Sequence, residues 1–178
     1  FSGYYSPGYA VGSLISIFYS SIGFMLPQTL SKYYDENNIL QFKKILNCSI
    51  KYFLLFAIPA TFGLSILSRP ILTILSTKDI AIIGYLITPY VALSYLLFGV
   101  KIIIENILAV KNKTKIIGIS VLIAAIFNLV LNLIFIPIFG INGAAFTTLM
   151  AFALHFLIIT FYSFRYIKFD LNLIFIVK

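Results

Sequence analysis

Long apolar runs separated by short polar connections occur along the whole chain. A helix needs roughly 20 mostly apolar residues to cross a bilayer core about 30 Å thick. Strands of a membrane barrel would alternate over about ten residues, whereas these runs are continuous. The pattern predicts an all-α integral membrane protein, a single bundle of about five transmembrane helices over residues 1–178. The expected spans are approximately 9–30, 47–68, 80–110, 116–137 and 143–164.

Two features at the termini lie outside this pattern. The tail RYIKFDLNLIFIVK, residues 165–178, predicts either an interfacial helix or a truncated sixth helix. The chain starts at Phe1, and FSGYYSPG is neither a basic leader nor a cleavable signal. We therefore expect the sequence to be a fragment of a longer protein.

The composition supports a membrane location. Hydrophobic residues make up 61% of the chain, charged residues 10%, and the mean hydropathy is +1.06. In a soluble protein the net charge of +8 would suggest a nucleic-acid partner. Here nearly all Lys and Arg residues lie between apolar runs, without a basic helix face. We expect membrane lipids as partners and no nucleic acid.

The basic residues also predict an orientation, because cytoplasmic loops are enriched in Lys and Arg. Of the 13 basic residues, ten fall in connections on one side, Arg69 and Lys78 fall on the other, and Lys101 lies within a span. The chain is therefore expected in the cytoplasmic membrane with its amino end outside and its carboxyl end inside. The ten residues expected inside are Lys32, Lys43, Lys44, Lys51, Lys111, Lys113, Lys115, Arg165, Lys168 and Lys178.

Lys101 and Glu105 are ionisable groups inside an apolar span. Such groups are costly in a membrane and usually face the protein interior or a water-filled cavity. Four residues apart, the two share one helix face and can form an ion pair. We predict that they line a cavity. The alternative is that Lys101 extends its ammonium group toward the cytoplasmic interface.

Three other polar residues within spans are candidates for a functional site. Asn128 and Asn132 share one helix face, where they could join helices by hydrogen bonds or present amides to a polar substrate. His155 lies at mid-depth; an imidazole can relay protons near neutral pH, or can simply pack in a hydrogen-bonded, neutral form. All three are candidate cavity-lining residues; the alternative is that they serve only in helix packing.

Prolines and small residues predict bends and close contacts. Pro59 and Pro89 each remove a backbone hydrogen bond inside a span and are candidate hinges. The stretch NLVLNLIFIPIFGINGAAFTTLMA, residues 128–151, predicts a tight outward-facing hairpin. Pro137 would end one helix, Gly140 would permit the reversal, and Gly143 with Ala144 would begin a close-packed return helix.

The chemistry-bearing residues do not form a catalytic pattern. Cys48 and His155 are single residues of their type, and their spacing matches no metal site. The sequence also lacks a phosphate-binding loop and a nucleophile elbow. We expect a protein that is not an enzyme and that uses no cofactor or metal.

Four places together resemble one family, and they span nearly the whole chain. The opening GYYSPGYAVGSL and the exit of the first span, Pro27 followed by LSKYYDENN, are two of them. The third is ENILAVKNKTK, although a glycine common in this turn of the family is missing. The most specific is the hairpin with Ile136-Pro137, Gly140 and Gly143-Ala144-Ala145. These motifs resemble the O-antigen type of lipid-linked oligosaccharide flippases in the multidrug/oligosaccharidyl-lipid/polysaccharide exporter superfamily.

The resemblance implies a transporter built from roughly twelve or more helices in two bundles. This chain would be the carboxyl-terminal half, and its missing partner would be the second bundle of the same protein. The substrate would be a lipid-linked sugar precursor for polysaccharide biosynthesis, carried across the membrane by alternating access. Of the basic residues, only Lys101 would lie deep enough to meet its pyrophosphate. Two alternatives stay open: a cation-coupled drug or toxin exporter that uses Glu105, and a non-transport membrane scaffold.

Overall fold

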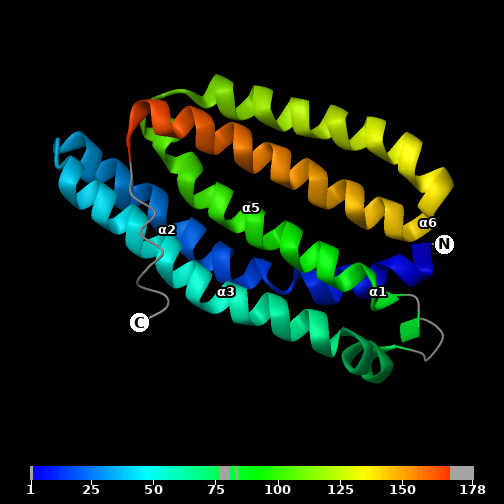
Figure 1. Cartoon of the computed structure of the whole chain (residues 1–178). Coiled ribbons are helices and arrows are strands. Elements are labelled where there is room, and N and C mark those ends of the chain that lie inside the picture. The colour runs from blue at the N-terminus through cyan, green and yellow to red at the C-terminus, as the bar shows by residue number, and fades with distance from the viewer. Residues whose placement is uncertain (1, 77–80, 83, 169–178) are drawn as a thin grey trace.

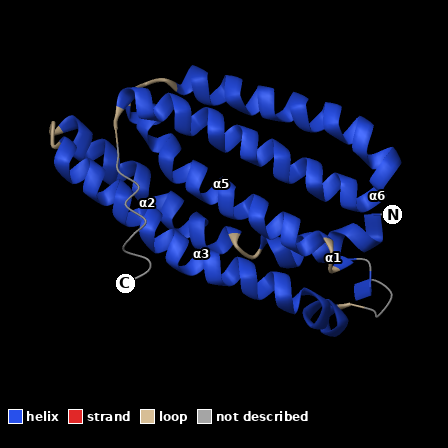
Figure 2. Cartoon of the chain, in the orientation of Figure 1, coloured by secondary structure: helices blue, strands red, loops and turns tan. Residues whose placement is uncertain are grey.

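The computed structural model describes residues 2–76, 81–82 and 84–168. Every regular element in the described part is a helix (Figure 2). The all-α membrane class predicted from the apolar runs is confirmed. The helices are α1 (Ser2–Ser13), α2 (Ser16–Asp35), α3 (Ile39–Leu75), α5 (Ile87–Val110) and α6 (Thr114–Tyr166).

The helices lie side by side and run back and forth across the molecule (Figure 1). Among the described residues, α3, α5 and α6 are each long and apolar enough to cross a membrane. The shorter α1 and α2 meet the same criterion together, across a bend of 48°. Because α6 reverses at Gly140, it supplies two antiparallel arms. The two arms overlap the spans expected over 116–137 and 143–164.

Helix α5 lies at the centre of the bundle and contacts α1, α2, α3 and α6. Its Ile103, Ile104 and Ile107 are fully buried. Lipid is as apolar as the helix surfaces, so association depends on close packing rather than on burial from water. Gly99 provides such a contact with α3, since a Cβ there would overlap the ring of Phe53.

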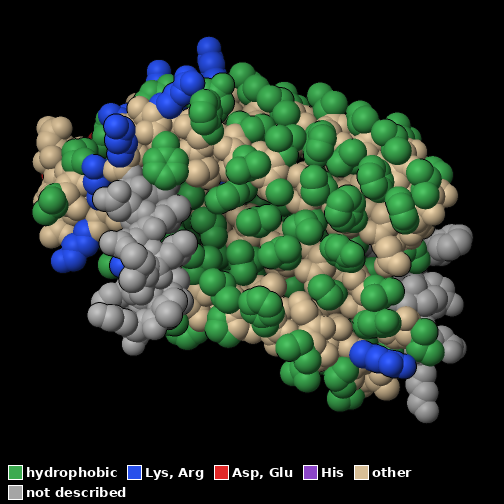
Figure 3. Space-filling view, viewed as in Figure 1, with side chains coloured by type: hydrophobic (Ala, Val, Ile, Leu, Met, Phe, Trp, Pro, Cys, Tyr) green, Lys and Arg blue, Asp and Glu red, His purple; other side chains and the backbone are tan. Residues whose placement is uncertain are grey.

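The face of the bundle seen in Figure 3 is largely apolar between its two ends. Large side chains such as Phe24, Leu133 and Ile74 are exposed by 79%, 70% and 83%. Such a continuous apolar surface would be unfavourable in water and suits contact with lipid chains.

Lys and Arg side chains gather at one end of the molecule (Figure 3). The ammonium of Lys111 lies 4.9 Å from the ring centroid of Tyr34, and that of Lys113 lies 5.8 Å from that of Tyr166. These cation–π contacts bring together the ends of α2, α5 and α6. We call this the basic end. Arg69, at the other end, lies over the ring of Tyr85.

Two asparagines make the short turns at the basic end. Asn37, between α2 and α3, and Asn112, between α5 and α6, each have φ of 55°. Asparagine adopts this left-handed conformation more readily than most residues. Asn38 then caps α3, its side-chain oxygen accepting from the backbone N–H of Gln41 at 3.1 Å. Short connections of this type make consecutive helices antiparallel neighbours.

The structure differs from the expected spans at two points. The span expected over 9–30 is broken between α1 and α2, and the one over 80–110 is interrupted by a turn at Tyr85 and Leu86. Pro89 is therefore the third residue of α5 and not a mid-helix hinge; the first turn of a helix tolerates proline because its N–H groups have no partner within the helix. Residues 77–80, 83 and 169–178, which include most of the expected tail helix, lie outside the described residues.

The other prolines lie inside helices. Pro59 is in the interior of α3, where its hinge role stays a prediction. Pro70 lies near the carboxyl end of the same helix. Pro137 does not end its helix as expected: helical structure continues to Phe139, and the reversal occurs at Gly140, whose φ of 58° and ψ of −134° are non-helical.

Candidate functional site

The two arms of α6 are held together by a short polar network near the Gly140 turn. The Asn132 amide donates to Oδ1 of Asn128 at 2.8 Å, and the Thr147 hydroxyl donates to Oδ1 of Asn132 at 2.5 Å. Gly143 allows close approach, because a Cβ there would lie 2.5 Å from the carbonyl oxygen of Phe135. The arms are thus fixed by hydrogen bonds and by backbone contact, both of which are effective in an apolar medium.

A cavity of about 430 Å³ lies between α5 and the two arms of α6. Its walls are mostly apolar, but several polar groups face it. This composition, apolar walls with a few converging polar groups, is typical of a ligand site. The lining residues are Tyr9, Phe98, Lys101, Val121, Ala124, Ala125, Asn128, Thr148, Ala151, Phe152 and His155.

Lys101 provides the positive charge in this cavity. The residue is only 4% exposed, and it lies ten positions, or roughly 15 Å, before the basic end of α5. Its ammonium forms an ion pair with Glu105 at 2.5 Å and lies 4.8 Å from the ring centroid of Phe98. The side chain therefore stays inside the bundle and does not extend to the interface. Glu105 supplies the compensating charge that a buried ammonium requires.

His155 faces the same cavity from the second arm of α6. It is 5% exposed, and its ring centroid lies 6.5 Å from that of Phe98. Among the described residues its Nε2 has no hydrogen-bond partner. A buried nitrogen in this state costs free energy unless a water or a ligand pairs with it. The imidazole can thus form a hydrogen bond with a polar ligand.

The structure brings together some of the predicted site residues and separates others. Lys101, Asn128 and His155 meet at the cavity, from three different helical segments. Asn132 and Glu105 do not line it: each instead holds a lining residue, Asn132 by a hydrogen bond and Glu105 by an ion pair. Both act as supports for the site.

Sequence reasoning missed the aromatic part of the cavity wall. Tyr9 and Tyr95 join α1 to α5 through a hydroxyl–hydroxyl hydrogen bond of 2.8 Å. The rings of Phe98 and Phe152 stack with their centroids 5.0 Å apart. The available signal was spacing, because each of these phenylalanines precedes a polar lining residue by three positions. In a chain with 18 phenylalanines, such spacing does not distinguish a site from ordinary packing.

Fold and cavity together define the class of the protein: a multi-pass, all-α membrane protein with a partly polar cavity between α5 and the two arms of α6. Sequence comparison then gives the family. The family described as Lipid II flippase MurJ matches residues 4–178, and the chain therefore belongs to this family.

Two curated relatives agree with this assignment. A probable low-salt glycan biosynthesis flippase, Agl15, of Haloferax volcanii is 29% identical over 170 residues, which cover 94% of this chain and 36% of the relative. A probable lipid II flippase MurJ of Rickettsia prowazekii is 41% identical over 68 residues, 38% of this chain and 13% of the relative. This chain thus spans about a third of the length of Agl15. The predicted resemblance to lipid-linked flippases is confirmed, while the O-antigen type and the carboxyl-terminal position stay predictions.

Proposed function

We propose that the chain is part of a flippase that carries lipid-linked sugar precursors across the cytoplasmic membrane by alternating access. The lipid tail of such a substrate stays in the bilayer, while its polar head needs a protein-lined path. The cavity between α5 and α6 would form one wall of that path. The two relatives, a probable glycan biosynthesis flippase and a probable lipid II flippase, support this class of substrate. No covalent step is required.

The observation that carries the proposal is Lys101 in the cavity wall. A charged residue buried at this depth usually marks a substrate or ion path. Lipid-linked sugars carry a phosphate or pyrophosphate at the link between lipid and sugar. An ammonium binds such an anion by charge-assisted hydrogen bonds, which are about twice as strong as neutral ones. Asn128 and His155 would then contact the neighbouring polar part of the head.

Glu105 would make this binding reversible. In the structure the Glu105 carboxylate is paired with the Lys101 ammonium, so an incoming anion must compete with the carboxylate for that ammonium. Glu105 is the more exposed partner, with 24% of its side chain accessible against 5% for Lys101. It can therefore turn toward water when a substrate binds, and return when the substrate leaves. In a protein without the Glu105 carboxylate, we expect the anion to stay bound to Lys101 longer.

Two further parts of the proposal concern the missing wall and the orientation. The chain spans about a third of Agl15, and we propose that a second bundle of the same protein closes the cavity. The excess of Lys and Arg at the basic end supports a cytoplasmic location for that end, with the Gly140 turn and the amino end outside.

The ion-coupled exporter is the weaker alternative, because Glu105, its expected ion ligand, is already paired with Lys101.

A depletion experiment tests the proposed function in the cell. When production of the whole protein stops, we expect the lipid-linked precursor to accumulate on the inner leaflet and surface polysaccharide or glycan to decline. A restored wild-type copy should reverse both effects. Precursor that continues to reach the outer leaflet at the original rate, with no related flippase expressed, would refute the proposal.

A further inference from the structure

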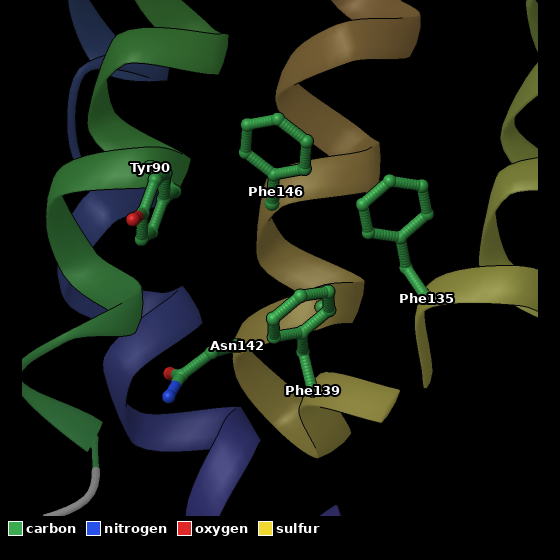
Figure 4. A pocket seen from close by; sticks show the side chains of 6 residues that line it. Tyr90, Phe135, Phe139, Asn142 and Phe146 are labelled. Carbon is green, nitrogen blue, oxygen red and sulfur yellow. The ribbon is translucent and has the colours of Figure 1, made fainter. Parts of the chain in front are cut away.

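A second pocket, of about 270 Å³, lies beside the Gly140 turn at the end of the bundle away from the basic end. The first arm of α6 is 26 residues long, so the two ends are roughly 39 Å apart. The pocket has no lining residue in common with the Lys101 cavity and is treated as a separate site. It is lined by Tyr90, Phe135, Phe139, Asn142, Gly143 and Phe146 (Figure 4).

Four aromatic rings form most of its wall. The rings of Phe135 and Phe139 are stacked at 5.7 Å, and Phe135 and Phe146 are tilted by 37° at the same centroid distance. Tyr90, from α5, meets Phe146 edge to face at 6.3 Å. The rings are thus fixed against one another across three helical segments. Their flat apolar faces line an open pocket and do not fill it.

Asn142 is the polar group of this pocket. Its side-chain oxygen is buried and has no hydrogen-bond partner among the described residues. An unpaired buried oxygen is costly, so a donor on a bound molecule would be favoured there. The lining includes no charged residue, which argues against an ionic ligand. The pocket therefore fits a neutral molecule with an apolar face and hydrogen-bond donors.

We propose that this pocket binds one neutral pyranose ring. A pyranose has C–H groups on its flat faces, which pack against aromatic rings, and hydroxyl groups at its edge, one of which would donate to Asn142. Ligand sites of this mixed composition use apolar walls for contact area and a few polar groups for orientation. The inference rests on the proposed function: the pocket would receive the sugar head at the outer end after translocation. The anion would by then have left Lys101.

Saturation-transfer difference NMR on the whole protein in lipid nanodiscs tests the site, with free N-acetylglucosamine as the probe. We expect saturation at the ring protons of the sugar. Phe139→Leu removes an aromatic face that is already 58% exposed, and Asn142→Ala removes the acceptor. Each should lower the signal at least fivefold. Phe62→Leu, an exposed phenylalanine on α3 outside the pocket, should leave the signal unchanged.

Several results would overturn the inference. These are the absence of saturation in the wild type, equal signals in the wild type and both pocket variants, or saturation of choline in place of the sugar, which would make the pocket a cation site. A translocation assay on the same samples separates this inference from the proposed function. Sugar binding without translocation refutes the function alone, and translocation without sugar binding refutes the pocket alone.

Discussion

Gly143→Ala tests the contact between the two arms of α6. A methyl group at this position would lie 2.5 Å from the carbonyl oxygen and 2.9 Å from the carbonyl carbon of Phe135, both backbone atoms. Backbone cannot rotate away as a side chain can, so the two arms must separate. Overpacking of this kind costs about 1–3 kcal/mol.

Gly118→Ala is the matched control. Gly118 lies near the start of the first arm, as Gly143 lies near the start of the second, and a Cβ on Gly118 would meet no atom within 4 Å. Both substitutions gain the helix propensity of alanine over glycine, up to about 1 kcal/mol. This gain cancels when the variants are compared. Gly143→Ala should therefore be less stable than Gly118→Ala by about 1–3 kcal/mol.

The free energy of unfolding can be measured by titrating sodium dodecyl sulfate into mixed micelles and following helix content by circular dichroism. Equal free energies for the two variants, within about 0.5 kcal/mol, would refute the reasoning, since that is the usual effect of a substitution without new contacts. Such a result would mean that Gly143 does not touch the first arm, and that the Gly140 turn is wider than described.

Three further predictions use the same protein. Lys101→Met leaves the carboxylate of Glu105 unpaired and should lower the free energy of unfolding by about 3–5 kcal/mol in the same titration. Lys101→Met combined with Glu105→Gln should lie near the wild type. Similar losses for both variants would contradict a buried ion pair. Thr147→Val removes a hydroxyl donor between the arms and should lower the free energy of unfolding by about 0.6–1.7 kcal/mol, with Thr147→Ser closer to the wild type. No loss in the valine variant would show that the hydrogen bond from Thr147 to Asn132 is not formed. Lys113→Cys in a Cys48→Ser background should react with a membrane-impermeant maleimide only after the cells are opened, and labelling of intact cells would place the basic end outside.

The lengths of the apolar runs were sufficient to predict the helical bundle, because the bilayer imposes a length on each span. The hairpin was predictable from Gly140, which permits the reversal. The breaks inside spans could not be predicted in the same way. The turn at Tyr85 and Leu86 lies within an apolar run, so hydropathy does not mark it. Its position decides that Pro89 begins a helix instead of bending one.

The candidate site was predictable only in part. Lys101 and His155 were recognisable because polar groups are costly at mid-membrane depth. Their meeting at one cavity depends on the packing of α5 against the second arm of α6, which no spacing along the chain encodes. The same holds for Asn142, which lies in a turn region where an asparagine is ordinary. Only the tertiary structure shows that its oxygen is buried and that the residue lines a pocket together with four aromatic rings.

The proposed contact between Lys101 and the anionic link of a lipid-linked sugar can be tested by a translocation assay in proteoliposomes. The whole protein would be reconstituted with a polyprenyl-pyrophosphate-linked sugar, and its appearance on the far leaflet followed over time. The variant with Lys101→Met and Glu105→Gln keeps the bundle neutral but loses the ammonium. Loss of one charge-assisted hydrogen bond, about 1.5–3 kcal/mol, should slow translocation about 10- to 150-fold. The exposed Lys115→Met should leave the rate unchanged, and a wild-type rate in the double variant would contradict the claim.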